Sequence, residues 1–216
     1  MKFAHISMLT VVLLVAGCHA APPMGVHYVT TINPLRAILA EIVRERGEVT
    51  ALLMPGASPH TYEPRPSDAI AAESALALFY AADDIDAWAA KLPAKKRIDL
   101  FSFVPETMRI PYDEAEHTDE ADHRHEHGSS NGHFWSDPNV VKAILPELVN
   151  RLCALDPEGT AAYKSNAAQF AEDLDDLDNE LKSAFANLDA RPVLMFHPSW
   201  TYFMKRYGLK IAGMVE

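Results

Sequence analysis

The sequence predicts an α/β fold in which two lobes are joined by a long helix. Short, β-capable apolar runs alternate with helical patterns through the first half of the chain. A long helical pattern follows, and after it come one more strand, helix and strand. Strands that alternate with helices are typical of βαβ units and a parallel sheet, whose ligands bind beyond the carboxyl ends of the strands.

Residues 21–155 are predicted to form the first lobe. Apolar runs at 26–32, 49–54, 75–80 and 98–101 are the expected strands, and the expected helices are 34–46, 66–73, 83–90 and 138–152. Residues 111–132 are acidic, rich in histidine, glycine and serine, and lack apolar periodicity, which predicts a mobile loop. Cys153 lies in an apolar helical pattern and is expected to be a buried small hydrophobe.

Residues 156–190 are predicted to form the linking helix. Asp156 is its expected N-cap and Pro157 its first helical residue. The apolar residues that follow are spaced by three or four: Tyr163, Ala167, Phe170, Leu174, Leu177, Leu181, Phe185 and Leu188. Such a helix reaches about 50 Å, more than one small lobe needs. A coiled-coil seam is the alternative, but the acidic opposite face lacks the basic partners of a seam.

Residues 191–216 are predicted to begin a second lobe, with strands at 191–196 and 209–215 and a helix at 198–207. These elements are too few to close a lobe of the size implied by the first half, so we expect the second lobe to be incomplete in this chain. Apolar side chains of this region are then expected to stay partly exposed, namely Val193, Leu194, Phe203, Leu209 and Ile211.

Charge and composition exclude one class of partner. The chain has 216 residues, of which 49% are apolar, which is enough for a substantial core. Its formal net charge is −11 at pH 7, and no basic stripe is present to neutralise phosphates. We therefore expect no nucleic-acid partner, and the acidic balance suits a protein that meets cations.

Residues 1–20 are typical of an export signal. Lys2 supplies a short positive region, residues 6–15 are apolar, and Val-Ala-Gly-Cys ends at Cys18. This segment resembles a bacterial lipobox, in which Cys18 is lipidated; cleavage after residue 20 is the alternative and releases a periplasmic protein. The apolar run is too short to span a bilayer. The sequence predicts a location in the periplasm or at the outer face of the cytoplasmic membrane.

Three histidines stand in proline-rich or aromatic surroundings. His60 lies in Pro-Gly-Ala-Ser-Pro-His-Thr-Tyr-Glu-Pro, His133 in Gly-His-Phe-Trp-Ser-Asp-Pro, and His197 in Phe-His-Pro-Ser-Trp. A lone histidine is more often a surface or core residue, so the prediction depends on all three contexts together. Pro59 and Pro64 stiffen the His60 segment, which lowers the cost of holding a site open. The pattern predicts a metal binder, since zinc favours imidazole nitrogen.

Three segments together resemble a known family. Residues 56–68, 133–138, and 197–203 with 207–209 are similar to the signature blocks of solute-binding proteins from bacterial zinc and manganese ABC importers. The resemblance covers nearly all of the chain after the signal, in the expected order. It implies two α/β lobes joined by a rigid long helix, with metal held in the cleft between them. It also implies delivery of the metal to a membrane permease, by a monomer without enzymatic activity.

The resemblance further implies the metal and its ligands. His60 and His133 are the implied ligands from the first lobe, and His197 the implied ligand from the start of the second. Zinc-type members have histidine at the third position and manganese-type members have glutamate, so His197 favours Zn²⁺ over Mn²⁺, in tetrahedral geometry. Many members add an acidic ligand far into the second lobe. Glu216 is too close to His197 to be its equivalent, so the fourth ligand stays open, with water as one option.

Residues 114–127 resemble the histidine-rich insert of zinc-type members. Four histidines stand there among six acidic residues: His117, His123, His125 and His127. Their alternation with other polar residues offers weak, exchangeable ligation, which favours metal capture or sensing. A solvated polar linker is the alternative interpretation.

Two other functions remain as alternatives. A zinc hydrolase would need a general base near a metal-bound water, but the chain has no HExxH element. Glu63 and Asp137 are conceivable bases, but both lie in segments that turn formation and helix capping already explain. A zinc-buffering or adhesive surface lipoprotein would share the lipobox and the histidine-rich loop. A permease gene encoded alongside would separate transport from that reading.

Overall fold

The computed structural model describes residues 25–112, 130–186 and 192–215. The predicted lipidation site and the loop histidines lie outside the described residues: Cys18, His117, His123, His125 and His127. Their roles therefore stay predictions. Within the described ranges, no helix combines the length and apolar character needed to cross a membrane.

The first half of the chain forms a parallel sheet, as the sequence predicts. Its strands are β1 (Val26–Thr30), β2 (Gly47–Ala51), β3 (Ala77–Tyr80) and β4 (Arg97–Asp99), in the order β2-β1-β3-β4. All three pairings are parallel. Successive side chains of β1 and β3, such as Val29 and Thr30 or Leu78 and Phe79, are buried on both faces of the sheet, which explains the mainly apolar sequence of β3 and of the centre of β1.

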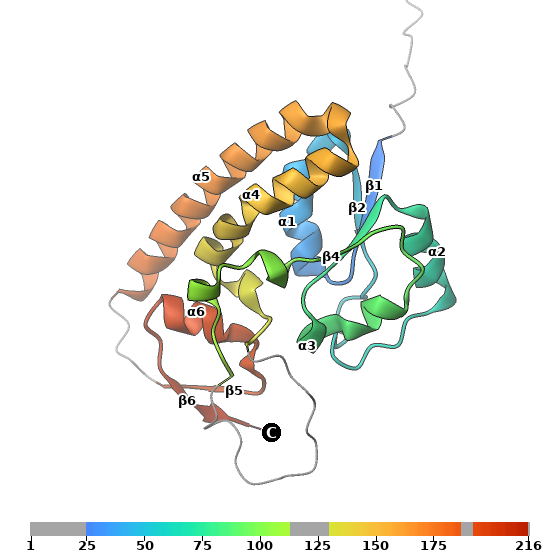
Figure 1. The fold of residues 1–216 in the computed structure, drawn as a ribbon. Helices are drawn as coiled ribbons and strands as arrows, with labels where there is room; N and C mark the ends of the chain where they lie inside the picture. Colours follow the sequence, from blue (N-terminus) through green and yellow to red (C-terminus); the bar gives the residue numbers. More distant parts are fainter. Residues whose placement is uncertain (1–24, 113–129, 187–191, 216) are drawn as a thin grey trace, which may run out of the picture.

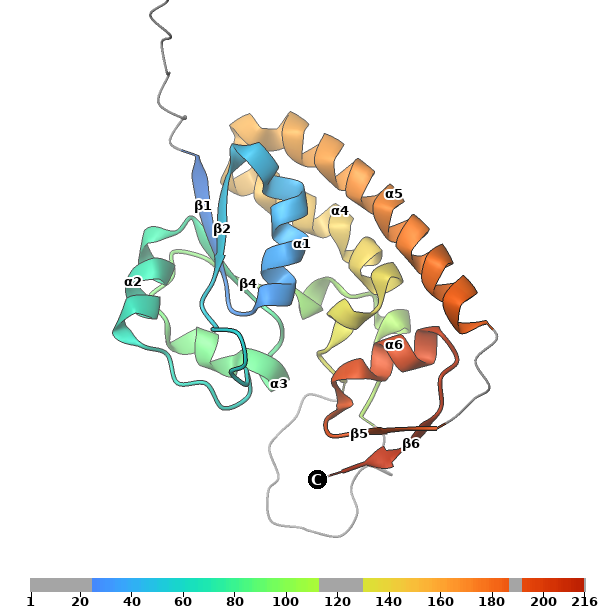
Figure 2. The ribbon, with the colours of Figure 1, turned by 180° about the vertical axis from the view of Figure 1, so that it is seen from behind.

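Helices cover the two faces of this sheet. Tyr28 and Phe79 point into a core shared with α1 (Asn33–Val43), while their neighbours Val29 and Leu78 point to the opposite face, into a core shared with α2 (Pro66–Ser74). This is the alternation of side chains along a strand. Figures 1 and 2 show α1 and α2 on opposite sides of the sheet. The short α3 (Asp83–Asp86) follows β3 in the chain after two residues.

Two long helices pack beside α1. These are α4 (Pro138–Leu155) and α5 (Thr160–Phe185), which run side by side in both views. The α5 side chains Tyr163, Ala167 and Leu174 belong to the same core as α1 and α4. The predicted apolar spacing corresponds to the packed face of α5 from Tyr163 to Leu174, whereas Leu177 is 43% exposed and Leu188 lies outside the described residues.

The start of the long helix differs from the prediction. Asp156 precedes a short 3₁₀ turn (Pro157–Gly159), and its carboxylate does not cap that turn. Instead it accepts two hydrogen bonds of 2.7 Å from Arg46 and one of 2.6 Å from the Tyr163 hydroxyl. A buried carboxylate gains more from a bidentate guanidinium than from a backbone amide. Arg46 holds the pKa of Asp156 below its usual range.

The last part of the chain forms a second, smaller parallel sheet with one helix. A 3₁₀ turn (Pro198–Trp200) and α6 (Thr201–Arg206) connect β5 (Val193–Met195) to β6 (Ile211–Met214), and the two strands pair in parallel. In this unit Val193 is 39% exposed, Leu194 63% and Ile211 38%, while Phe203 and Leu209 are half-buried. The expected partial exposure of these side chains is confirmed.

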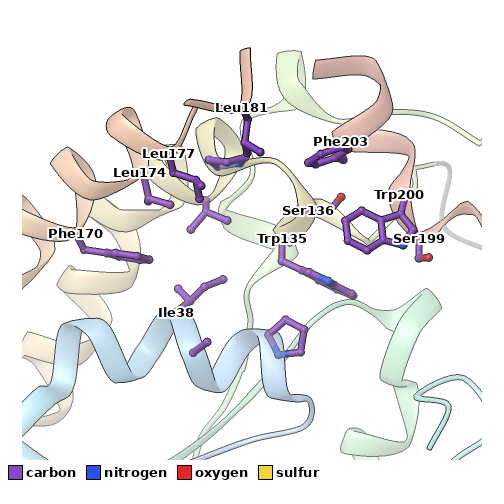
Figure 3. Close-up of a pocket in the computed structure, with 14 residues that line it drawn as sticks. Ile38, Trp135, Ser136, Phe170, Leu174, Leu177, Leu181, Ser199, Trp200 and Phe203 are labelled. Atoms are coloured by element: carbon purple, nitrogen blue, oxygen red, sulfur yellow. The ribbon is translucent and has the colours of Figure 1, made fainter. Parts of the chain in front are cut away.

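An apolar groove of about 660 Å³ lies where this unit approaches the long helices. It is lined by Ile38 of α1, Leu177 and Leu181 of α5, and the rings of Trp200 and Phe203 (Figure 3). Almost all of the lining side chains are hydrocarbon or aromatic, so the groove offers no set of metal ligands.

Candidate metal centre

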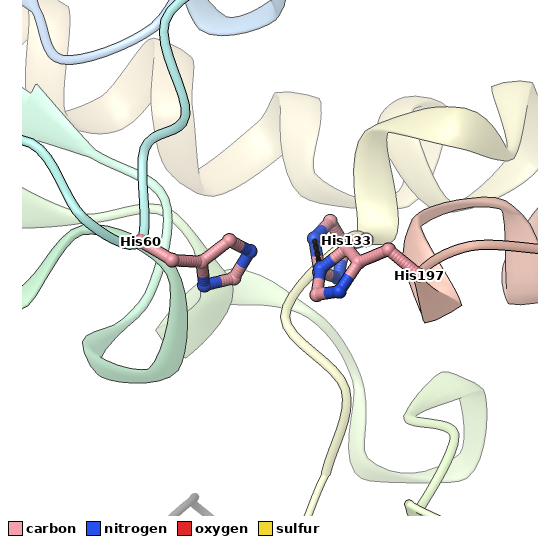
Figure 4. Close-up of side chains that lie close together, drawn as sticks. All are labelled: His60, His133 and His197. Carbon is pink, nitrogen blue, oxygen red and sulfur yellow. Dashed lines mark hydrogen bonds between the residues drawn. The ribbon is translucent and has the colours of Figure 1, made fainter. Parts of the chain in front are cut away.

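The three predicted histidines lie together at one place. His60 comes from the segment between β2 and α2, His133 from the segment before α4, and His197 from the turn after β5. Each offers one ring nitrogen to a cluster in which all such atoms lie within 4.8 Å of one another. Figure 4 shows His60 reaching across toward the other two rings. Within the part of the chain that the structure describes, no carboxylate belongs to this cluster.

The backbone of α3 orients His60. The Nδ1 atom of this ring lies 3.0 Å from the carbonyl oxygen of Asp84. Because a carbonyl only accepts, Nδ1 carries the hydrogen, and the lone pair of the neutral ring is on Nε2. The Trp88 indole also donates to the carbonyl of Pro59 at 2.8 Å, which fixes the chain just before the histidine. Metal-binding histidines commonly hold their second nitrogen in this way.

His133 is the buried member of the cluster, with 2% of its surface exposed. Its Nδ1 lies 2.8 Å from Oδ1 of Asn131. Burial lowers the pKa of His133 to about 3, and the neighbouring imidazoles of His197 and His60 add to the decrease. The ring is therefore neutral at pH 7, the protonation state that a metal requires.

His197 approaches His133 directly. The two Nε2 atoms are 3.2 Å apart, so one hydrogen lies between them. His133 is neutral and its Nδ1 donates to Asn131, which leaves a lone pair on its Nε2. His197 is therefore the donor of this contact. A cation held by both nitrogens would require this hydrogen to leave the position between them.

Asp84 also connects the His60 and His133 segments. Its Oδ2 accepts hydrogen bonds from the Gly132 amide at 3.0 Å and from the Tyr112 hydroxyl at 2.6 Å. A Cβ atom on Gly132 would stand 2.4 Å from Oδ1 of Asp84, so glycine is required for this close approach. The backbone before His133 is thus packed directly against the residue that orients His60.

The sequence did not identify Asp84 or Asn131. The Asn131-Gly132 pair immediately before His133 is a turn signal that marks a close backbone approach. Nothing in the sequence around Asp84 separates it from the adjacent Asp83. The interpretation of Asp137 is confirmed, because its carboxylate caps α4 by accepting from the Asn139 amide at 2.8 Å.

Comparisons with known proteins show what this chain is similar to. Residues 29–216 match the family of zinc-uptake complex component A, periplasmic. The high-affinity zinc uptake system protein ZnuA of Paracoccus denitrificans (strain Pd 1222) is 29% identical over 214 residues, covering 87% of this chain and 66% of that protein. The manganese-binding lipoprotein MntA of Halalkalibacterium halodurans is 25% identical over 218 residues, covering 97% and 69%.

A solved structure gives the same result for the fold. The crystal structure of ZnuA superposes with a TM-score of 0.72 at 25% identity, over 87% of this chain and 69% of the other. The chain therefore spans about two thirds of the length of the proteins it resembles.

Proposed function

Because this chain belongs to the family of periplasmic components of zinc-uptake complexes, we propose that it captures Zn²⁺ outside the cytoplasm and delivers it to an ABC permease. The observation that carries the proposal is the convergence of three imidazoles from three separate segments. Zn²⁺ is the cargo of such a protein, and no chemical step is required of the site.

In this proposal His60, His133 and His197 are the metal ligands. Two of them already present Nε2, because their Nδ1 atoms donate to fixed oxygen acceptors. Three imidazoles make up most of a tetrahedral zinc shell, and water or a further protein group completes it. Zinc is favoured over manganese, because carboxylate and water ligands suit manganese better than imidazole does.

The proposal also includes roles for Cys18 and for the histidine-rich loop, which lie outside the described residues. Cys18 anchors the protein to lipid at the outer face of the membrane, and the histidine-rich loop at 114–127 captures metal weakly before it reaches the site. The protein acts as a monomer.

Calorimetric titration with zinc tests the ligand assignment. We expect one tight site, weakened by more than about 100-fold in His60→Ala, since losing even an outer partner of a ligand costs about 10- to 100-fold. His27→Ala is the matched control, because His27 lies on β1 and contacts Thr50 instead of the cluster. Deletion of residues 114–130 should leave the tight site intact. Loss of tight binding in the deletion but not in His60→Ala would refute the assignment.

The pH dependence of binding tests the state of His133. Affinity should fall as pH falls, because protonated imidazole cannot bind metal. His133 is already neutral through this range, since its pKa lies near 3. Zinc binding between pH 5 and 7 should therefore release at most two protons from the three ligands. Calorimetry in buffers of different ionisation enthalpy counts these protons, and a release of three would contradict the neutral His133.

A further inference from the structure

Asn131 is the most fully bonded polar residue beside the cluster. It is 1% exposed. Its backbone amide donates to the carbonyl of Ile110 at 2.7 Å, and its carbonyl accepts from the Tyr202 hydroxyl at 3.0 Å. Its side chain faces two different segments of the chain, that of His133 and that of Pro198. A buried residue whose polar groups are all satisfied is held rigidly by its partners.

The partners also fix which end of the amide faces which segment. The carbonyl of Pro198 can only accept, so the group 2.9 Å from it is the NH₂ of Asn131. The amide oxygen must then face His133, where it accepts from the backbone N–H at 2.9 Å and from Nδ1 at 2.8 Å. This oxygen holds the hydrogen of His133 on Nδ1 and leaves the lone pair on Nε2.

The same side chain holds two of the three imidazoles in place. Pro198 directly follows His197, so the donated hydrogen bond fastens the His197 segment beside His133. Only a side chain with both a donor and an acceptor makes both contacts. Asparagine meets this requirement, aspartate keeps only the acceptor, and leucine of similar size keeps neither.

We propose that Asn131 is a positioning residue that selects the metal-binding tautomer of His133 and ties the His197 segment to it. The inference rests on the proposed metal function. Removal of such an outer partner typically weakens metal binding by about 10- to 100-fold. The residue acts through the two histidines and is not itself a ligand.

Three variants separate positioning from simple packing. Asn131→Leu removes both hydrogen bonds. Asn131→Asp restores the acceptor for His133 but not the donor for Pro198. The matched control is Asn166→Leu on α5, because Asn166 also donates to a backbone carbonyl, that of Ile42 at 3.0 Å, away from the cluster.

The readouts are the tautomer of His133, from long-range ¹H–¹⁵N NMR of the metal-free protein, and zinc affinity from calorimetry. We expect wild type to show Nδ1–H, and Asn131→Leu to mix the tautomers and bind zinc about 10- to 100-fold more weakly. Asn131→Asp should restore the tautomer and recover part of that loss. A purely packing role predicts the opposite order, because a charged carboxylate at a buried position is at least as disruptive as leucine.

Three results would overturn the proposal: Nε2–H on His133 in wild type, zinc affinity of Asn131→Leu equal to that of Asn166→Leu, or an aspartate variant no better than leucine in both readouts. The wild-type tautomer tests the idea even if neither Asn131 variant folds. If wild type binds no zinc, the proposed function fails, while the tautomer measurement still decides whether Asn131 positions His133.

Discussion

The two parallel sheets of this protein are built in different ways. In the first sheet, Val29, Leu78 and Phe79 are completely buried, with helices on both faces. In the second, Leu194 of β5 is 63% exposed and Phe196, just after that strand, is 84% exposed. The first region is therefore stabilised mainly by apolar burial, which depends on area removed from water.

The second region is held in place by polar and aromatic contacts with the rest of the chain. Arg206 of α6 donates two hydrogen bonds, of 2.9 and 2.6 Å, to Asp178 of α5. The Tyr202 hydroxyl accepts from the Ile110 amide and donates to the Asn131 carbonyl. The His197 segment therefore depends on these directional bonds together with the buried ring of Tyr202, whereas His133 is itself buried. The difference teaches that His133 is enclosed by a closed core, whereas the His197 segment has fewer buried apolar neighbours and depends more on directional hydrogen bonds and an ion pair.

The largest expected effect is the difference in stability loss between two phenylalanine-to-alanine substitutions, one in each sheet region. Phe79→Ala should lower the free energy of unfolding by about 3–5 kcal/mol, because it leaves a cavity in a closed core. Phe196→Ala should change it by less than about 0.5 kcal/mol, because the ring is already in water. Urea denaturation followed by circular dichroism measures both. Similar losses in the two variants would mean that the second sheet is covered in solution.

A second test uses pH, because two buried carboxylates respond in opposite directions. Burial raises the pKa of Asp86 to about 6. The stability that Asp86 contributes is fully present below about pH 3.9, its pKa in the unfolded chain. This stability is lost as the pH rises through about 6, the pKa in the folded protein. Arg206 holds the pKa of Asp178 well below its usual range. The contribution of Asp178 is present above about 3.9 and is lost as pH falls toward that lowered pKa.

Replacing each of these aspartates by asparagine should therefore have opposite effects: Asp86→Asn makes the fold more sensitive to acid, and Asp178→Asn makes it less sensitive. Between pH 6 and 4, Asp86→Asn should lose about 2–3 kcal/mol more stability than wild type, because wild type gains stability there as Asp86 takes up its proton. Below pH 4, Asp178→Asn should lose less than wild type. Urea denaturation at pH 3.5, 4, 5 and 6 measures these slopes. Parallel curves for all three proteins would contradict the assigned environments.

The smallest expected effect isolates the ion pair that holds α6. At pH 7, Asp178→Asn should lower the free energy of unfolding by about 1–2 kcal/mol, because Arg206 keeps its charge in a partly buried position and loses its nearer carboxylate, with only Asp137 left at 3.8 Å. Asp175→Asn on the same helix is the matched control. Its partner contact, to Lys142, lies between exposed side chains, so the loss should stay below about 0.5 kcal/mol. Equal losses would mean that Asp178 acts only as a surface charge.

The sequence by itself determined the order of elements and the three segments that carry the histidines. Apolar runs separated by turns predict strands wherever a sheet is buried on both faces, and all four predicted strands of the first sheet form. The long helix was recognisable because its apolar spacing persists for several turns. The histidine segments were recognisable because proline and aromatic neighbours make each of them distinctive over a short stretch.

Only the tertiary structure decided how those parts are fastened together. Asn131 meets Pro198, Asp84 meets Gly132, and Asp156 meets Arg46 in place of the predicted cap. Each pair joins segments far apart along the chain, and local sequence periodicity carries no information about which distant residues will be in contact. The state of His133 was likewise out of reach, because its lowered pKa comes from burial and from two imidazoles that folding alone brings beside it.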